Sequence, residues 1–86
     1  MMPTVEKILE EREKTHGKFC DHAYYTQSIK GVMRESVNWP DLSPSQAESL
    51  DMIAHKIGRI LAGDPFVKDH WADIAGYAEL VARELK

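Results

Sequence analysis

The chain has 86 residues, of which 43% are hydrophobic and 29% are charged, and its formal net charge at pH 7 is −3. This composition argues against disordered, collagen-like and low-complexity classes, and the acidic balance is unlike that of a general nucleic-acid-binding protein. Since no apolar run approaches the ~20 residues of a membrane span, we expect a single globular domain over residues 1–86 with neither nucleic acid nor membrane as a partner.

Capping and breaking residues predict a first helix that begins after Pro3, with Thr4 as its N-cap. This helix runs to about His16 and ends at Gly17, a residue suited to a left-handed C-cap. A second helix is expected over residues 22–35, because its apolar residues recur at i, i+4, i+7 and i+8. These residues are Tyr25, Ile29, Val32 and Met33.

The clearest start signal in the chain precedes the third helix. Ser43 suits the N-cap, Pro44 the first helical position, and Gln46 the reciprocal bond of a capping box. Gly63 is expected to end the helix. Its apolar arc comprises Leu50, Ile53, Ala54, Ile57, Ile60 and Leu61.

The fourth helix is expected over residues 69–84, with the carboxylate of Asp69 near its N-terminus. Four helices without a strand indicate an all-α, four-helix bundle, and the short connection between the last two helices predicts that they are antiparallel. A core of this size is marginal, so we expect a homo-oligomer that completes the bundle.

Two polar residues continue the apolar stripe of the first helix. At the helical period, Arg12 and His16 fall within about 40° of Val5. An arginine on the core face needs an anionic partner, so we expect Arg12 to be buried and bonded to Asp51 or Asp73. A purely structural ion pair and a contact to a ligand are both open interpretations.

Acidic residues and histidines gather beside the apolar stripes of the third and fourth helices. Each set lies within an arc of about 60°: Glu48, Asp51 and His55 on one helix, and His70, Asp73 and Tyr77 on the next. If the two helices pack together, these arcs face one cavity, and carboxylates with imidazole are typical ligands of Mg²⁺ or Mn²⁺. The alternative is that the arcs are the solvated flanks of ordinary amphipathic helices.

Three segments carry a resemblance that covers nearly the whole chain. Arg-Glu-Lys-Thr-His-Gly-Lys-Phe (12–19), Leu-Asp-Met-Ile-Ala-His-Lys-Ile-Gly-Arg-Ile (50–60) and Asp-His-Trp-Ala-Asp-Ile-Ala-Gly-Tyr (69–77) resemble segments of small phage and prophage proteins without assigned activity. More distantly, the chain is similar to the MazG-like all-α nucleoside triphosphate pyrophosphohydrolases. Those enzymes carry Glu-x-x-Glu on one helix and Glu-x-x-Asp on the next, matched here by Glu48-x-x-Asp51 and His70-x-x-Asp73.

The resemblance implies a MazG-like bundle whose nucleotide pocket is completed by a second subunit. It implies a metal-dependent pyrophosphohydrolase, or a nucleotide-binding relative, in the cytoplasm of a host cell. The catalytic residues would be Glu48, Asp51 and Asp73, and the ligands of Mg²⁺ or Mn²⁺ would be Glu48, Asp51, Asp69 and Asp73. Substrate would contact Arg12, His16, Lys56 and Tyr77. His70 departs from the family pattern, which has an acid there.

A second hypothesis belongs to another class of protein. The chain is then a non-catalytic phage interaction module that binds a host or viral protein, and its acidic arcs are solvated surface. Trp39, Phe66 and Tyr24 would be contact residues. The single cysteine, Cys20, cannot form a disulfide within the chain, and the start of the chain turns charged within six residues. Both features favour a cytoplasmic protein without a signal peptide.

Overall fold

The structure is a computed structural model that describes residues 4–86; Pro3, predicted to precede the first helix, lies outside them. Residues 4–86 form no strand and four α-helices, which confirms the predicted all-α fold. The elements are α1 (Val5–His16), α2 (Phe19–Arg34), the 3-10 helix η1 (Trp39–Asp41), α3 (Pro44–Ala62) and α4 (Lys68–Glu84).

The predicted caps determine where α1 and α3 begin. Thr4 Oγ1 accepts a hydrogen bond of 3.2 Å from the backbone N–H of Lys7. The backbone N–H of Gln46 donates to Ser43 Oγ at 3.1 Å, and the backbone N–H of Ser43 donates to Gln46 Oε1 at 2.8 Å. The capping box is therefore confirmed. In contrast, α2 begins at Phe19, three residues before the predicted start. No side chain caps this end of the helix, so the sequence carries no local start signal there.

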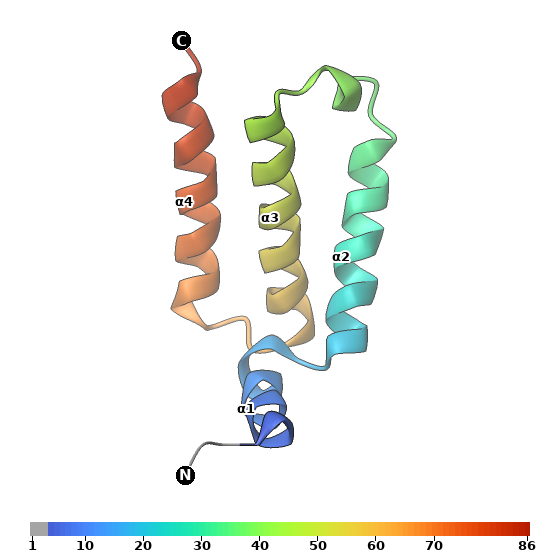
Figure 1. Ribbon diagram of the computed structural model, residues 1–86, viewed down its shortest axis with the longest axis vertical. Coiled ribbons are helices and arrows are strands. Elements are labelled where there is room, and N and C mark those ends of the chain that lie inside the picture. Colours follow the sequence, from blue (N-terminus) through green and yellow to red (C-terminus); the bar gives the residue numbers. More distant parts are fainter. Residues whose placement is uncertain (1–3) are drawn as a thin grey trace.

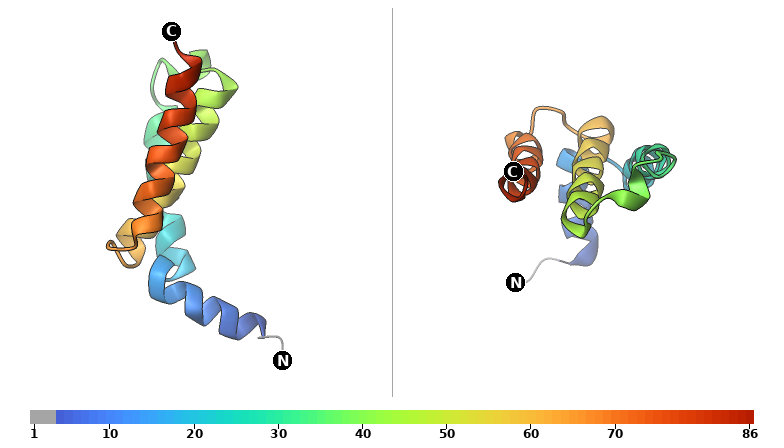
Figure 2. Two further views of the ribbon diagram at one scale, coloured as in Figure 1. Left: turned by 90° about the vertical axis from the view of Figure 1, so that its left-hand side faces the viewer. Right: turned by 90° about the horizontal axis from the view of Figure 1, so that it is seen from above.

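Helix α3 lies in the middle of a single layer, with α2 on one side and α4 on the other (Figure 1). The view from above shows these three helices side by side, and α1 projects from one end of the layer (Figure 2). The Cα radius of gyration is 15.0 Å, whereas a compact domain of this length has about 12 Å. The elongated shape follows because no second layer of helices covers the first.

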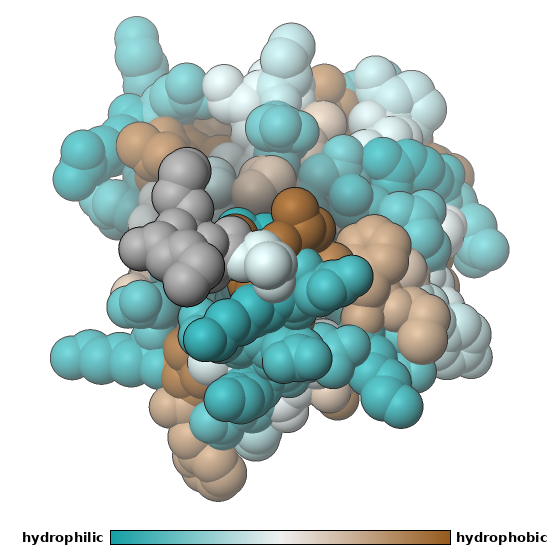
Figure 3. Space-filling view, turned by 60° about the horizontal axis from the view of Figure 1, so that its bottom comes forward, coloured by the Kyte–Doolittle hydropathy of each residue, from teal (hydrophilic) through white to brown (hydrophobic). Residues whose placement is uncertain are grey.

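The consequence of one layer is a very small core. Ala54 is the one hydrophobic residue within 4–86 that is fully buried. Large apolar side chains remain open to solvent, among them Val32 at 68% exposure and Leu61 at 54%. Figure 3 looks at the end of the molecule that carries α1, where brown hydrophobic groups lie open between teal hydrophilic ones.

Two glycines let the α1–α2 turn cross the α3–α4 turn. Gly17 ends α1 as predicted, with a positive φ of 78°, although its ψ of −177° is not that of a left-handed cap. A Cβ on Gly17 would collide with the backbone of Ala62, and one on Gly63 would collide with the backbone of Thr15. The crossing is held by a 3.1 Å hydrogen bond from the backbone N–H of Asp64 to Thr15 O.

Gly58 lets α2 and α3 approach each other closely. A Cβ here would meet Thr26 Oγ1 and would stand 2.6 Å from Cδ2 of His22. We expect Gly58→Ala to lower the free energy of unfolding by about 1–3 kcal/mol, the usual cost of overpacking. Gly76→Ala is the matched control, because nothing lies within 4 Å of its added methyl group.

Urea denaturation measures both variants. The control should be unchanged or more stable by up to about 1 kcal/mol, since alanine favours helix over glycine. An equal gain in stability for Gly58→Ala would contradict the close approach of the two helices.

Candidate functional site

Arg12 does not occupy the buried position predicted for it. Its side chain is exposed and makes no ion pair within residues 4–86. The physical reason is that α1, which ends just before Gly17, projects from the end of the layer (Figure 2), and its apolar stripe borders only an open groove beside Phe19 and His22 of α2. Val5 is 71% exposed and Leu9 is 54% exposed on the same helix. The prediction of a buried Arg12 bonded to Asp51 or Asp73 is therefore wrong.

The two aspartates proposed as partners of Arg12 are paired with other cations. Asp51 accepts two hydrogen bonds of 3.1 Å from Nη2 of Arg34, whose guanidinium also lies 4.8 Å from the ring centre of Trp39. Asp73 Oδ2 lies 3.0 Å from Nζ of Lys56, whose side chain is only 11% exposed. Both carboxylates therefore have a neutralising partner within the chain.

Asp51 and the Lys56–Asp73 pair lie on opposite flanks of α3, so the carboxylates of Asp51 and Asp73 do not meet. The successive residues His55 and Lys56 differ by about 100° around the helix axis. His55 packs against His22 of α2, and Asp51 lies one turn away on that same flank. Lys56 faces α4. Because α3 has a neighbour on each side, Asp51 and His55 of its acidic arc are directed toward α2, whereas Glu48 lines a hollow beside α4.

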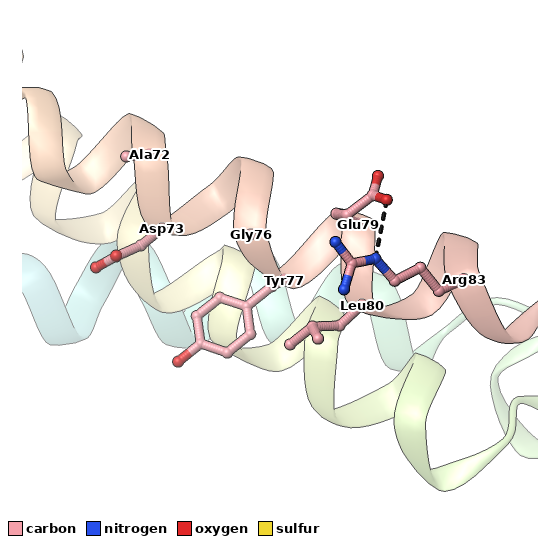
Figure 4. Close-up of a pocket in the computed structure, with 7 residues that line it drawn as sticks. All are labelled: Ala72, Asp73, Gly76, Tyr77, Glu79, Leu80 and Arg83. Carbon is pink, nitrogen blue, oxygen red and sulfur yellow. Dashed lines mark hydrogen bonds and ion pairs between the residues drawn. The ribbon is translucent and has the colours of Figure 1, made fainter.

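Three of the predicted site residues line two hollows, one between α3 and α4 and one along α4 alone. Glu48 and Tyr77 border one hollow of about 470 Å³, together with Leu80 and Glu84. Tyr77 and Asp73 border a second hollow of about 440 Å³, shown in Figure 4, where both side chains point to the same side of α4.

Glu48 and Asp69 both carry exposed side chains. In the described part of the chain, residues 4–86, no three His, Cys, Asp or Glu side chains are grouped to hold a metal ion. A role for Glu48, Asp51, Asp69 and Asp73 as ligands of Mg²⁺ or Mn²⁺ stays a prediction, and within a single chain their carboxylates do not form one group.

The structure instead gathers all four histidines of the chain near the α1 end of the layer. The rings of His16 and His70 lie 5.2 Å apart, and those of His22 and His55 lie 4.5 Å apart. His22 Nε2 is 3.1 Å from the backbone oxygen of His55, and His70 Nε2 is 3.5 Å from that of Thr15. We call this group, with Arg59, the histidine cluster. Sequence reasoning treated the histidines separately, because they come from four different helices.

Burial and nearby cations lower the pKa of three histidines of this cluster. Desolvation is the first cause that lowers the pKa of His16, His22 and His55, and the pKa of His55 falls to about 4. The guanidinium of Arg59 is the strongest charged neighbour that lowers the pKa of each of these rings.

These lowered pKa values predict that the protein loses stability in mild acid. The unfolded chain binds protons on its histidines below pH 6.5, whereas the folded chain resists protonation until the pH nears 4 at His55. The contribution of the unprotonated histidines to the free energy of unfolding is therefore fully present above pH 6.5 and is lost as the pH drops toward 4. The full shift at His55 would exceed 3 kcal/mol, but partial exposure screens it, so we expect a loss of about 1–2 kcal/mol.

Thermal unfolding followed by circular dichroism at pH 7.5 and pH 5 measures this loss. His55→Gln should flatten the dependence between these two values. Stability that is unchanged or higher at pH 5 would contradict the desolvated, cation-flanked environment of the cluster.

Comparison of the chain with protein-family models, with curated proteins and with solved structures found no match. Within the described residues 4–86, no helix has the length and apolar character needed to cross a membrane. The fold and the site geometry thus define an all-α protein with one layer of three helices and a projecting helix. Its function is inferred from these features.

Proposed function

We propose that the protein is a non-catalytic interaction module that works as a homo-oligomer, with a second copy covering the apolar side of the helical layer. The observation that carries this proposal is the uncovered apolar face. It is the face of α3 that includes Leu50, Ile57 and Leu61, which fall within about 40° of one another on the helix. Leu50 is 39% exposed and Leu61 is 54% exposed.

The apolar face extends from α3 onto both neighbouring helices. A mainly apolar hollow of about 310 Å³ runs from Leu42 and Leu50 to Val81 of α4. A second hollow of about 220 Å³ shares Leu42 and Leu50 and reaches Met33 and Trp39 on the other side. The two hollows form a continuous groove across the layer, which is a shape that a helix of another chain fills.

The area of the molecule supports a second copy as the occupant. The accessible surface is 6585 Å², about 1,400 Å² more than the ~5,200 Å² expected for a compact monomer of 9.8 kDa. A stable interface buries about 1,200–2,000 Å² in total over both partners. Two copies packed through the apolar face would form two helical layers around one core, which a single layer lacks.

A dimer of this kind leaves the apolar stripe of α1 open for another protein. Val5 is 71% exposed and Leu9 is 54% exposed on α1, the helix that projects from the end of the layer (Figure 2). The resemblance to small phage proteins is the basis for proposing a host or viral protein as that partner. Multi-angle light scattering over a range of concentrations tests the assembly. We expect a dimer or larger oligomer at micromolar concentration, and a monomer throughout would refute the proposal.

A metal-dependent nucleotide pyrophosphohydrolase of the MazG-like type is a second candidate function. It is favoured by two neighbouring hollows that share Tyr77, one between α3 and α4 with Glu48 in its lining and one along α4 with Asp73 in its lining. A second chain would have to supply the remaining ligands of Mg²⁺ or Mn²⁺. Pyrophosphate release from a panel of nucleoside triphosphates, with and without Mn²⁺, tests this candidate. Release that depends on metal and is lost in Glu48→Gln would favour it over the non-catalytic module.

A further inference from the structure

We infer that the histidine cluster binds a phosphate-type oxyanion, with the guanidinium of Arg59 as its principal partner. This site goes beyond the proposed interaction function, because it lies at the α1 end of the layer and does not involve the apolar face. Its ligand could be inorganic phosphate or the phosphate of a larger molecule, since the recognising chemistry is the same.

The state of Arg59 is the first observation that supports an anion site. Its Nε is fully buried and has no hydrogen-bond partner. Nor does the guanidinium form an ion pair with any carboxylate in residues 4–86. A guanidinium cannot lose its charge in a protein, and its five N–H donors need acceptors once they leave water. Arg59 is therefore a partly buried cation that lacks its counter-ion.

The histidines supply the second observation. The Nε2 atoms of His22 and His70 face backbone oxygens, whereas the rings of His16 and His55 make no hydrogen bond within the described residues 4–86. Among the charged groups around these two rings, Arg59 lowers their pKa the most. Neutral imidazole can donate one N–H to an anion and becomes a cationic donor on protonation.

Further cations around the cluster lower the pKa of its rings. Lys56 lowers the pKa of His16 and His55, and Lys30 lowers that of His22 and His55. Arg12 lowers the pKa of His16.

Several acids are also close. Asp21 and Asp69 directly precede His22 and His70, and the backbone N–H of Asp64 donates to Thr15 O, which His70 Nε2 also faces. Two further acids have partners or surroundings that place them.

The first acid is Asp73, which is paired with Lys56. The second is Glu13, which lines a groove of about 210 Å³ beside Arg12, His16 and His22. Within residues 4–86, none of these carboxylates forms an ion pair with Arg59.

This donor set favours an oxyanion over a metal ion. A cation would be repelled by Arg59, and no three metal-ligating side chains are grouped within residues 4–86. An oxyanion with several acceptor oxygens instead matches the planar donors of a guanidinium and the N–H groups of the imidazoles. Bound anion would also reverse the cationic influence on the rings, so binding and protonation must favour each other.

The test is a calorimetric titration with inorganic phosphate, at an ionic strength held constant with sodium chloride. We expect saturable binding to the wild-type protein that becomes tighter from pH 7.5 to pH 6. Arg59→Gln should weaken binding by about tenfold or more, because it removes a charge-assisted hydrogen-bond donor. Arg83→Gln is the matched control and should leave the affinity unchanged, since Arg83 is an exposed arginine of α4 paired with Glu79.

A second variant protects the test against misfolding of Arg59→Gln. Arg12 is exposed, so Arg12→Gln should keep the fold and still weaken phosphate binding about two- to threefold by removing a nearby positive charge. Titration with adenosine monophosphate in place of phosphate distinguishes a free anion from a nucleotide, and tighter binding of either one supports the site.

Three results would overturn the inference. They are the absence of binding above the chloride background, equal weakening by Arg83→Gln, and dissociation of an oligomer by Arg59→Gln without any phosphate effect. The last result would mean that a carboxylate of a second copy neutralises Arg59. Light scattering on the same samples keeps the outcomes separate, because a wild-type monomer that binds phosphate would refute only the proposed interaction function.

Discussion

Replacing Leu50 with arginine is expected to convert the oligomer into a monomer that keeps its helical content. Leu50 borders both apolar hollows and is already 39% exposed in the single chain. The change therefore removes little packing within one copy, but it places a charge at the centre of the proposed interface. We expect the dissociation constant to rise at least about a hundredfold, as for a central interface residue.

The control for this experiment is an equally drastic change at an exposed leucine elsewhere. Leu80 is 58% exposed on α4, where it lines the hollows on the other side of the layer. Leu80→Arg should leave the mass measured by light scattering unchanged. If both variants dissociate the oligomer, or if neither does, the apolar face is not the interface.

Removing the carboxylate of Asp73 is expected to destabilise the fold, even though Asp73 is itself half exposed. Its side chain is 48% exposed, but the ammonium group that it neutralises belongs to Lys56, whose side chain is only 11% exposed. Asp73→Ala would leave a nearly buried cation without a partner. We expect a loss of about 2 kcal/mol in the free energy of unfolding, somewhat below the cost of breaking a fully buried pair.

Replacing Lys56 instead of Asp73 should cost less free energy of unfolding, and the difference between the two losses is the test. Lys56→Met removes the buried charge and leaves Asp73 free to be solvated, so we expect a loss below about 1 kcal/mol. Asp69→Asn changes an exposed carboxylate in the first turn of the same helix and should cost no more than a few tenths of a kcal/mol. Urea denaturation of the three variants gives the order. A larger loss for Lys56→Met than for Asp73→Ala would contradict the buried-cation explanation.

The ion pairs also bear on the metal hypothesis. A metal ion at Asp51 or Asp73 would have to displace Arg34 or Lys56 from its carboxylate. That exchange costs free energy at Lys56 above all, since its charge is nearly buried. Assembly of the predicted metal site therefore requires a rearrangement of these pairs in addition to a second chain.

The sequence by itself was sufficient to predict four helices and the ends of α1 and α3. The capping box at Ser43, the N-cap at Thr4 and the terminating Gly17 and Gly63 are local signals, because each acts through hydrogen bonds or dihedral angles within one turn. The start of α2 was missed because Lys18 supplies no side-chain cap.

Only the tertiary structure decided which faces of these helices meet. The helical period places Asp51 and Asp73 on definite arcs, but their partners depend on α3 having α2 on one flank and α4 on the other. Periodicity likewise placed Arg12 on an inward stripe, and the turn at Gly17 directs that stripe away from the layer. The histidine cluster joins residues from four helices. Such contacts depend on the global path of the chain, which local spacing does not specify.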